Sequence, residues 1–468
     1  MTASNPGIAN ADLVFRGRCL LPGGLQQAAV VIRGGIIVHI DVAEGVSFAP
    51  DMSGTRDPAQ IVDLAHDEVL LPGLVDTHVH VNEPGRTEWE GFASATRAAA
   101  AGGVTTIIDM PLNSIPPTVD GPALDLKRAA TEGQRFVDVG FWGGAVPASL
   151  GHLAEVYDEG VFGFKSFLLH SGVDEFPPLD AGQLEEAMAE IADLDGLLIV
   201  HAEDAATIEA APVCSGPSYA NFVRSRPPEA EDRAIGQVIE LAGRLGTRVH
   251  ILHLSNAASL GRLAAARDAR VQVTVETCPH YLTLSAEQVE DGATQFKCCP
   301  PIRDAANQDL LWQGLGDGVI DIVVSDHSPA TPDLKHLESG DFGEAWGGVS
   351  SLQLGLSLIW TEAVARGHGL GDVVRWMARG PATVAAVPGK GSLQVGGDAD
   401  VVVFAPDESF VVDPNQLHHK NTLTPYAGRP LYGLVRQTWL RGQQVADHGT
   451  VFDAPTGRLL TRGGSRRV

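Results

Sequence analysis

The chain has 468 residues, of which 33 are Lys or Arg and 58 are Asp or Glu, so that its formal net charge is −25 at pH 7. A strongly negative surface repels phosphate backbones and anionic lipids, which disfavours nucleic acids and membrane surfaces as partners. Hydrophobic residues make up 44% of the chain and charged residues 19%, as in a globular protein with a large core and unlike a disordered chain.

The first residues, MTASNPGIANADLVF, show no basic stretch followed by an apolar one, and no run of about 18 uncharged apolar residues occurs. The five cysteines form no CxxC pair, so neither a disulfide framework nor zinc binding by thiolates is expected. We therefore expect a cytoplasmic protein.

Residues 12–42 predict short strands that are interrupted by PGG and RGG turns. From about residue 71, apolar runs alternate with Ala-rich helical stretches, a pattern typical of βαβ units and a parallel sheet. There are eight such runs: LVDTHVH (74–80), VTTIIDM (104–110), VDVGFW (137–142), VFGFKSF (161–167), LLIVHAE (197–203), RVHILHL (248–254), VQVTVET (271–277) and VIDIVVSD (319–326). Eight parallel strands with helices between them fit a closed α/β barrel, (β/α)8 or TIM-like, better than an open sheet.

Near the end of the chain, ADVVVFAP and LVRQTWLRGQQV return to short strands that resemble the N-terminal unit. Terminal strands often pair when the two ends of a domain lie close together. We therefore expect two domains: a small composite β-sandwich formed by residues 1–70 and 391–468, and a hydrolase barrel formed by residues 71–390.

Metal-competent side chains lie near the carboxyl ends of five of these runs, where barrel enzymes carry their sites. They are His78 and His80 on the first run, Lys165 on the fourth, His201 on the fifth, His253 on the sixth and Asp326 on the eighth. The two-residue spacing of His78 and His80 places both imidazoles on one side of a strand. An unpaired lysine at a buried strand end favours its neutral amine. Imidazole and oxygen ligands suit zinc, although manganese, cobalt and iron also fit.

The segments around these residues, PGLVDTHVH, GFKSF, VHAED, ILHLS and VSDHSP, resemble the amidohydrolase superfamily in its cyclic amidohydrolase branch, over nearly the whole chain. The resemblance implies two divalent metal ions bridged by a hydroxide and by Lys165, which carbon dioxide converts to N6-carboxylysine. It assigns His78, His80 and Asp326 to one ion and His201 and His253 to the other. Two such cations lower the pKa of bound water and polarise a carbonyl group. Asp326 would accept the hydroxide proton and pass it to the departing nitrogen, as general base and then acid.

The other candidates have simpler interpretations. Taken singly, a histidine is more often a surface or core residue than a ligand, and we interpret His39, His66, His152 and His368 in that way. Asp76 and Asp109 also end strands, where we expect them to support the site or form turns. Nothing beside Cys298 and Cys299 suggests an activated thiolate, so packing or backbone contacts are expected of them.

Three groups of the branch differ around the substrate. Dihydroorotases resemble HxHxREPG, but Asn82 occupies the position of the arginine that grips a substrate carboxylate, which favours a neutral ring unless Arg86 replaces that arginine. Hydantoinases and dihydropyrimidinases carry a tyrosine five positions after the lysine, where this chain has His170.

Six further segments resemble allantoinases most: NEPGRTEWEGF, DMPLNSIPPT, KSFLLHSGVDEFP, ETCPHYLTL, KCCPPIRD and AWGGVSSLQ. This resemblance implies hydrolytic ring opening of allantoin to allantoate in purine breakdown. A hydantoinase or dihydropyrimidinase is the alternative. A non-enzymatic scaffold relative, which would have lost ligands, is disfavoured because all six positions are intact.

Substrate contacts are less clearly indicated. Asn113 could bind a ureido group or tether its loop, and by analogy with the branch the backbone at Cys299 and near Gly348 could pair with the ring amide. The loop SGVDEFP could act as a lid hinged near Gly172. His170 could donate to an oxyanion or simply face solvent. A homodimer or homotetramer is expected from the resemblance alone.

Overall fold

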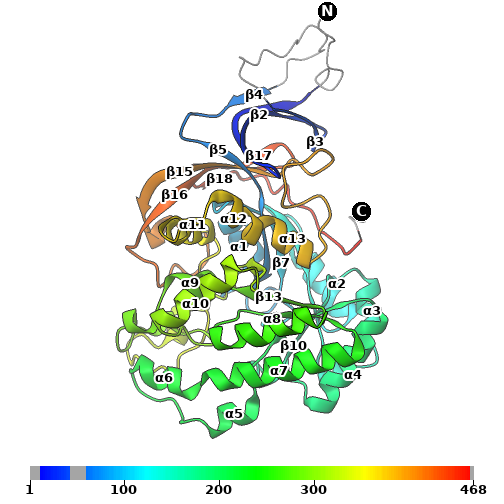
Figure 1. The fold of residues 1–468 in the computed structure, drawn as a ribbon, viewed down its shortest axis with the longest axis vertical. Coiled ribbons are helices and arrows are strands. Elements are labelled where there is room, and N and C mark those ends of the chain that lie inside the picture. The colour runs from blue at the N-terminus through cyan, green and yellow to red at the C-terminus, as the bar shows by residue number, and fades with distance from the viewer. Residues whose placement is uncertain (1–10, 43–59, 464–468) are drawn as a thin grey trace, which may run out of the picture.

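A computed structural model describes residues 11–42 and 60–463 of the chain, as a parallel barrel with a large sheet packed against it (Figure 1). Residues 1–10, 43–59 and 464–468, which the sequence places in the β domain, lie outside the described residues. Within the described ranges, no helix combines the length and the apolar character needed to cross a membrane.

The barrel strands are all parallel to their neighbours, in the orders β6-β7-β8 and β9-β10-β11-β12-β13-β14. They are β6 (Leu74–Val79), β7 (Val104–Asp109), β8 (Asp138–Phe141), β9 (Gly143–Gly144), β10 (Phe164–Phe167), β11 (Leu197–His201), β12 (Arg248–Ile251), β13 (Val273–Thr277) and β14 (Ile322–Val323). A parallel bridge between Val79 and His327 joins the first strand to the segment after the last. There the backbone N–H of His80 donates to the carbonyl of His327 at 2.8 Å. The predicted eight-stranded barrel is thus confirmed, with β9 as a two-residue addition after β8.

The barrel strands are shorter than their apolar runs, as the eighth and the fourth show. The eighth run, 319–326, has regular pairing only over β14, and Asp326 has a φ of 43°, outside the extended region. The fourth run pairs with both neighbours from Phe164 onward, and just before this residue the chain passes very close to β11. A Cβ atom at Gly163 would lie 2.4 Å from the carbonyl oxygen of Leu197.

The helices between the strands cover the outside of the barrel (Figure 1). They are α1 (Phe92–Ala101), α2 (Gly121–Ala130), α3 (Leu153–Asp158), α4 (Ala181–Asp193), α5 (Ala205–Ala210), α6 (Tyr219–Ser225), α7 (Pro228–Leu245), α8 (Leu260–Asp268), α9 (Pro279–Thr283), α10 (Ala305–Gly316), α11 (Gly355–Ala365), α12 (Leu370–Val374) and α13 (Gly380–Val384). Four of them, α2, α4, α5 and α10, begin after an aspartate whose carboxylate accepts a backbone N–H of the first turn. In these four helices the aspartate marks the transition from loop to helix.

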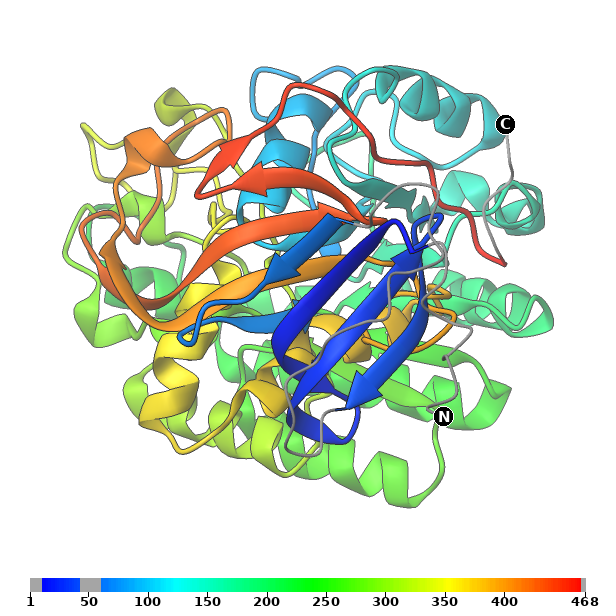
Figure 2. The same ribbon diagram turned by 90° about the horizontal axis from the view of Figure 1, so that it is seen from above.

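The large sheet contains strands from both ends of the chain (Figure 2). Its strands are β1 (Leu13–Leu21), β2 (Gly24–Arg33), β3 (Ile36–Val42), β4 (Gln60–Asp63), β5 (Val69–Pro72), β15 (Val401–Val411), β16 (Pro430–Leu440), β17 (Gln443–Asp447) and β18 (Thr450–Val451). β5 lies between β1 and β15, with Pro72 opposite Val401. The composite β domain of the predicted fold is therefore present, while its residue boundaries remain a prediction.

A buried ionic cluster joins the barrel to this sheet. The Nζ atom of Lys390 lies 2.7 Å from Asp138 at the start of β8, 2.6 Å from Asp400 beside β15 and 2.8 Å from Asp398. Arg441 pairs with Asp138 from the end of β16 at 2.6 Å. Since Lys390 is almost fully buried, three carboxylates compensate the desolvation of its ammonium group.

Candidate metal centre

A cavity of about 340 Å³ lies at the carboxyl ends of the barrel strands. All six predicted ligands line it: His78, His80, Lys165, His201, His253 and Asp326. The three predicted substrate contacts, Asn113, Cys299 and Gly348, line it as well. A larger cavity, of about 530 Å³, contains none of these residues.

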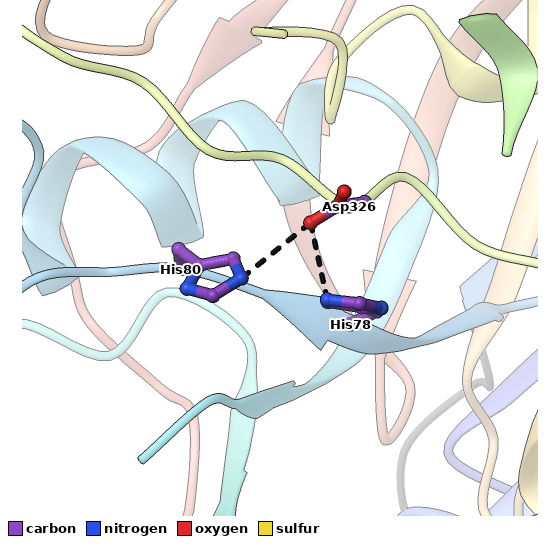
Figure 3. A group of neighbouring side chains, drawn as sticks. All are labelled: His78, His80 and Asp326. Carbon is purple, nitrogen blue, oxygen red and sulfur yellow. Dashed lines mark ion pairs between the residues drawn. The ribbon is translucent and has the colours of Figure 1, made fainter. Parts of the chain in front are cut away.

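One group of predicted ligands consists of His78 on β6, His80 directly after that strand, and Asp326 after β14 (Figure 3). Asp326 Oδ1 lies 3.1 Å from His78 Nε2 and 3.4 Å from His80 Nε2. All three side chains are buried, and their donor atoms lie within 4.8 Å of one another. This spacing can accommodate a cation between them.

Lys165 on β10 lies next to this group. Its Nζ atom is 3.5 Å from His78 Nε2 and 5.0 Å from the ring of Phe167. No carboxylate lies within ion-pair distance of it among the described residues, although only 1% of the side chain's surface is exposed. Burial lowers the pKa of Lys165 to about 8, so about a tenth of the amine is neutral at pH 7.

His201 and His253 form the second part of the centre, with ring centroids 4.5 Å apart. His201 Nε2 lies 2.7 Å from Glu203, which leaves its Nδ1 atom for another partner. His253 has a buried Nδ1 atom with no hydrogen-bond partner. Burial lowers the pKa of both imidazoles, which keeps them in the neutral form that binds metals.

Two buried glutamates hold the outer nitrogens of these rings, and the sequence interpretation did not assign them a role. Glu276 on β13 lies 2.5 Å from His78 Nδ1, 3.0 Å from His250 Nε2 and accepts the backbone N–H of His253 at 3.1 Å. Glu203 binds the outer ring nitrogen of His201, Nε2, at 2.7 Å. Metal-binding histidines usually donate their other ring N–H to such a carboxylate, which fixes the ring orientation.

The pKa values of His78, His80 and Asp326 are shifted in different directions. Burial lowers the pKa of His78, but the carboxylates of Asp326 and Glu276 outweigh burial and raise it to about 9. Burial and the nearby Lys165 lower the pKa of His80 to about 3. Burial alone would raise the pKa of Asp326, yet contacts with His78 and His80 hold it well below its usual range. The carboxylate is therefore ionised and available to a cation.

The donor set fits divalent metal ions. Imidazole nitrogens, a carboxylate and a lysine amine converge on one cavity, whose lining also contains Cys298 and Cys299. His253 has an unsatisfied buried nitrogen, and Lys165 is a buried amine without an ion-pair partner among the described residues, which are costly arrangements for a protein alone. Metal ions and a carboxylated lysine would satisfy both.

The predicted substrate contacts differ in what they offer. Asn113 Nδ2 lies 3.4 Å from His80 Nδ1. The backbone N–H and C=O of Cys299 have no hydrogen-bond partner among the described residues. Gly348, in contrast, donates its N–H to Lys297 at 2.8 Å and accepts from Lys335 at 2.6 Å. Cys299 is thus the freer of the two predicted backbone contacts.

The residues that separate the three groups of the branch are also placed. Arg86 lies 2.5 Å from Glu175 and donates to the carbonyl of Asn113 at 2.8 Å, and it does not line the cavity. His170 lines the cavity, but its ring bonds Asp174 at 3.3 Å and the N–H of Gly172 at 3.1 Å. Both side chains are engaged with loops around the cavity.

The two strand-end aspartates and Asn82 lie outside the cavity lining. Asp76 accepts the backbone N–H groups of His78 and Ser325, each at 3.0 Å, and so connects the first strand to the last. Asp109 pairs with the buried Lys127 at 2.7 Å. Asn82 Nδ2 lies 3.4 Å from the carbonyl of Pro329.

Comparisons with known proteins agree with this geometry. The amidohydrolase family profile matches residues 69–445. The chain is 54% identical to an allantoinase of Streptomyces avermitilis, over 97% of this chain and all of that protein. It is 43% identical to an allantoinase of Saccharomyces cerevisiae, over 94% of this chain and 96% of that protein. Among solved structures, an L-hydantoinase (dihydropyrimidinase) of Arthrobacter aurescens superposes with a TM-score of 0.88 at 30% identity, covering 97% of this chain and all of the other.

Proposed function

We propose that this chain, which belongs to the amidohydrolase family, is a metal-dependent hydrolase that opens the ring of allantoin to give allantoate. The observation that carries the proposal is the convergence of six metal-competent side chains, from five different βα units, on one cavity. The 54% identity to an allantoinase over nearly the whole chain supports the substrate.

In this proposal the centre holds two divalent ions, most simply zinc. His78, His80 and Asp326 would hold one ion, His201 and His253 would hold the other, and Lys165, as its carbamate, would supply oxygen ligands to the centre. The neutral amine of Lys165 attacks carbon dioxide, forms a C–N bond and releases one proton, and its pKa of about 8 favours this step. When bound, the two ions lower the pKa of water and polarise the carbonyl group of the ring amide.

Residues of the chain then transfer the proton of the attacking water and orient the metal ligands. The ion pairs of Asp326 use its Oδ1 atom, so we assign Oδ2 to accept the proton of the attacking water. Asp326 returns this proton to the departing nitrogen, which otherwise leaves poorly as an anion. Glu276 and Glu203 keep His78 and His201 in the required orientation.

The substrate in this proposal is a neutral cyclic ureide. Asn82 is turned toward Pro329 and Arg86 is held by Glu175, so neither residue offers a cation to a substrate carboxylate at the cavity wall. Asn113 and the backbone of Cys299 supply hydrogen-bonding groups to the ring and its substituent. A neutral ligand with several amide groups needs such directed polar contacts.

A substrate panel with zinc-reconstituted protein tests the proposal. We expect allantoate from allantoin at a higher kcat/KM than the hydrolysis of dihydrouracil or of 5-substituted hydantoins. A preference for dihydrouracil would instead assign a dihydropyrimidinase, the alternative consistent with the 30% identity to the Arthrobacter protein. Fewer than about one ion per chain after purification with zinc would contradict the two-metal centre and revive a non-enzymatic role.

We also propose a cytoplasmic homodimer or homotetramer. The compartment is supported by five free cysteines, none of which forms a disulfide, as expected in a reducing environment. The assembly rests on the family resemblance alone. Light scattering and cell fractionation measure the two properties directly.

A further inference from the structure

A guanidinium group lies on the wall of the cavity without a role in the mechanism above. Arg226 follows α6 and lines the cavity, with 17% of its side-chain surface exposed. Its Nε atom donates to Glu203 at 3.1 Å and its Nη2 atom to the same carboxylate at 2.5 Å. The remaining Nη1 amino group has no hydrogen-bond partner among the described residues.

Glu203 connects this guanidinium to the metal centre. The fully buried carboxylate of Glu203 lies between Arg226 and His201, and it bonds His201 Nε2 at 2.7 Å. Arg226 is therefore held rigidly by two parallel hydrogen bonds, outside the ring of ligands. The part of a substrate that extends away from the reacting amide would lie at such a position.

A second cation on the same wall is already occupied. Lys297 lines the cavity and donates from Nζ to the carbonyls of Ala345 at 2.5 Å and of Gly343 at 3.4 Å. These contacts hold the loop after β14. Of the two cations, Arg226 is the one whose free N–H groups are already oriented by a partner on their opposite side.

We propose that Arg226 is a specificity-determining residue that donates from Nη1 to the carbonyl oxygen of the ureido substituent of the substrate. This inference rests on the proposed function, because it assigns a contact for the arm that distinguishes allantoin from unsubstituted hydantoin. A urea carbonyl is a good acceptor for a guanidinium, and a charged donor makes a stronger hydrogen bond than a neutral one. Glu203 would then orient both the substrate donor and a metal ligand.

The substitution Arg226→Lys tests this contact and keeps a positive charge beside Glu203. We expect the KM for allantoin to rise about 10- to 100-fold, the range for losing a charged hydrogen bond. Hydantoin has no ureido arm, and its Ki as a competitive inhibitor of allantoin hydrolysis should change less than about threefold. Metal content and Tm should remain those of the unsubstituted protein.

Arg303→Lys is the matched control. Arg303 also pairs with a buried glutamate, Glu231, at 2.6 Å, but it does not line the cavity. We expect the ratio of allantoin KM to hydantoin Ki to stay unchanged in this variant. Equal changes in both constants for Arg226→Lys, or loss of metal with no change in the ratio, would overturn the contact and leave Arg226 a structural partner of Glu203.

The proposed function can fail separately. If the unsubstituted protein does not hydrolyse allantoin, the substrate assignment is wrong, and the contact proposed for the ureido arm is wrong with it. If that protein hydrolyses allantoin while Arg226→Lys retains its KM, only the assignment of Arg226 is wrong.

Discussion

Replacing Glu276 by glutamine should weaken metal binding without unfolding the barrel. The side chain keeps its shape but loses its charge and one of two acceptor atoms. In the unsubstituted protein, Oε1 accepts from His78 and His253, while Oε2 accepts from His250. With the amide oxygen in the Oε1 position, the new NH2 group faces His250 Nε2, which accepts from it when the proton of His250 moves to Nδ1 beside Thr274. His78 would then be oriented by a neutral acceptor.

The magnitude follows from the hydrogen bonds. Bonds to charged groups contribute about 1.5–3 kcal/mol and neutral ones about 0.5–1.5 kcal/mol, so His78 loses about 1–2 kcal/mol of orienting energy. At about 1.4 kcal/mol per factor of ten, metal affinity should fall roughly tenfold, at the lower end of the 10- to 100-fold range for such outer residues.

Chelator competition followed by elemental analysis of the protein measures this affinity, and thermal unfolding checks the fold. Glu155→Gln is the control, because Glu155 pairs with His152 at 3.0 Å on the exposed surface, away from any candidate ligand. Unchanged metal affinity in a stable Glu276→Gln protein would refute the orienting role.

Three further predictions concern the amine, the ionic cluster and the pH dependence of stability. Lys165→Ala should lose both bound metal and activity, measured by elemental analysis and allantoate release, and retained activity would contradict the carbamate. Lys390→Met leaves the buried Asp400 without an ion-pair partner among the described residues, while Asp138 keeps Arg441, and should cost about 3–5 kcal/mol in urea unfolding, whereas a loss below about 1 kcal/mol would contradict that. Burial lowers the pKa of His419 from 6.5 to about 3. As the pH falls below 6.5, His419 therefore becomes protonated in the unfolded chain but stays neutral in the folded chain. This histidine should therefore reduce the free energy of unfolding by about 2 kcal/mol between pH 6.5 and 5, and His419→Leu should remove that part of the pH dependence.

The sequence predicted the elements whose signal is local. Each barrel run is apolar enough to predict a buried strand, and the spacing of His78 and His80 can be recognised within three residues. The composite sheet was also predictable, because both ends of the chain return to short strands. The ends of the strands were less predictable. The backbone of Asp326 has a positive φ, outside the extended region, and its residue type does not indicate this.

The contacts that complete the centre depend on the closure of the barrel. Glu276 and His78 are separated by 198 positions, and only strand order brings them together. Glu203 was within reach of the sequence, since it follows His201 by two residues. Arg226 was not, because it comes from the loop region after α6 and meets Glu203 only through the fold.

The strand order of the large sheet in Figure 2 also has a consequence for folding during translation. Strands β1–β5 leave the ribosome first. However, β5 can pair with its neighbour β15 only after the whole barrel has been synthesised. During translation the backbone groups of β5 present an open edge, which favours pairing with other chains. A product truncated before β15 would keep that unpaired edge permanently. Pairing with the C-terminal strand β15 therefore covers the backbone edge that the N-terminal strand β5 exposes.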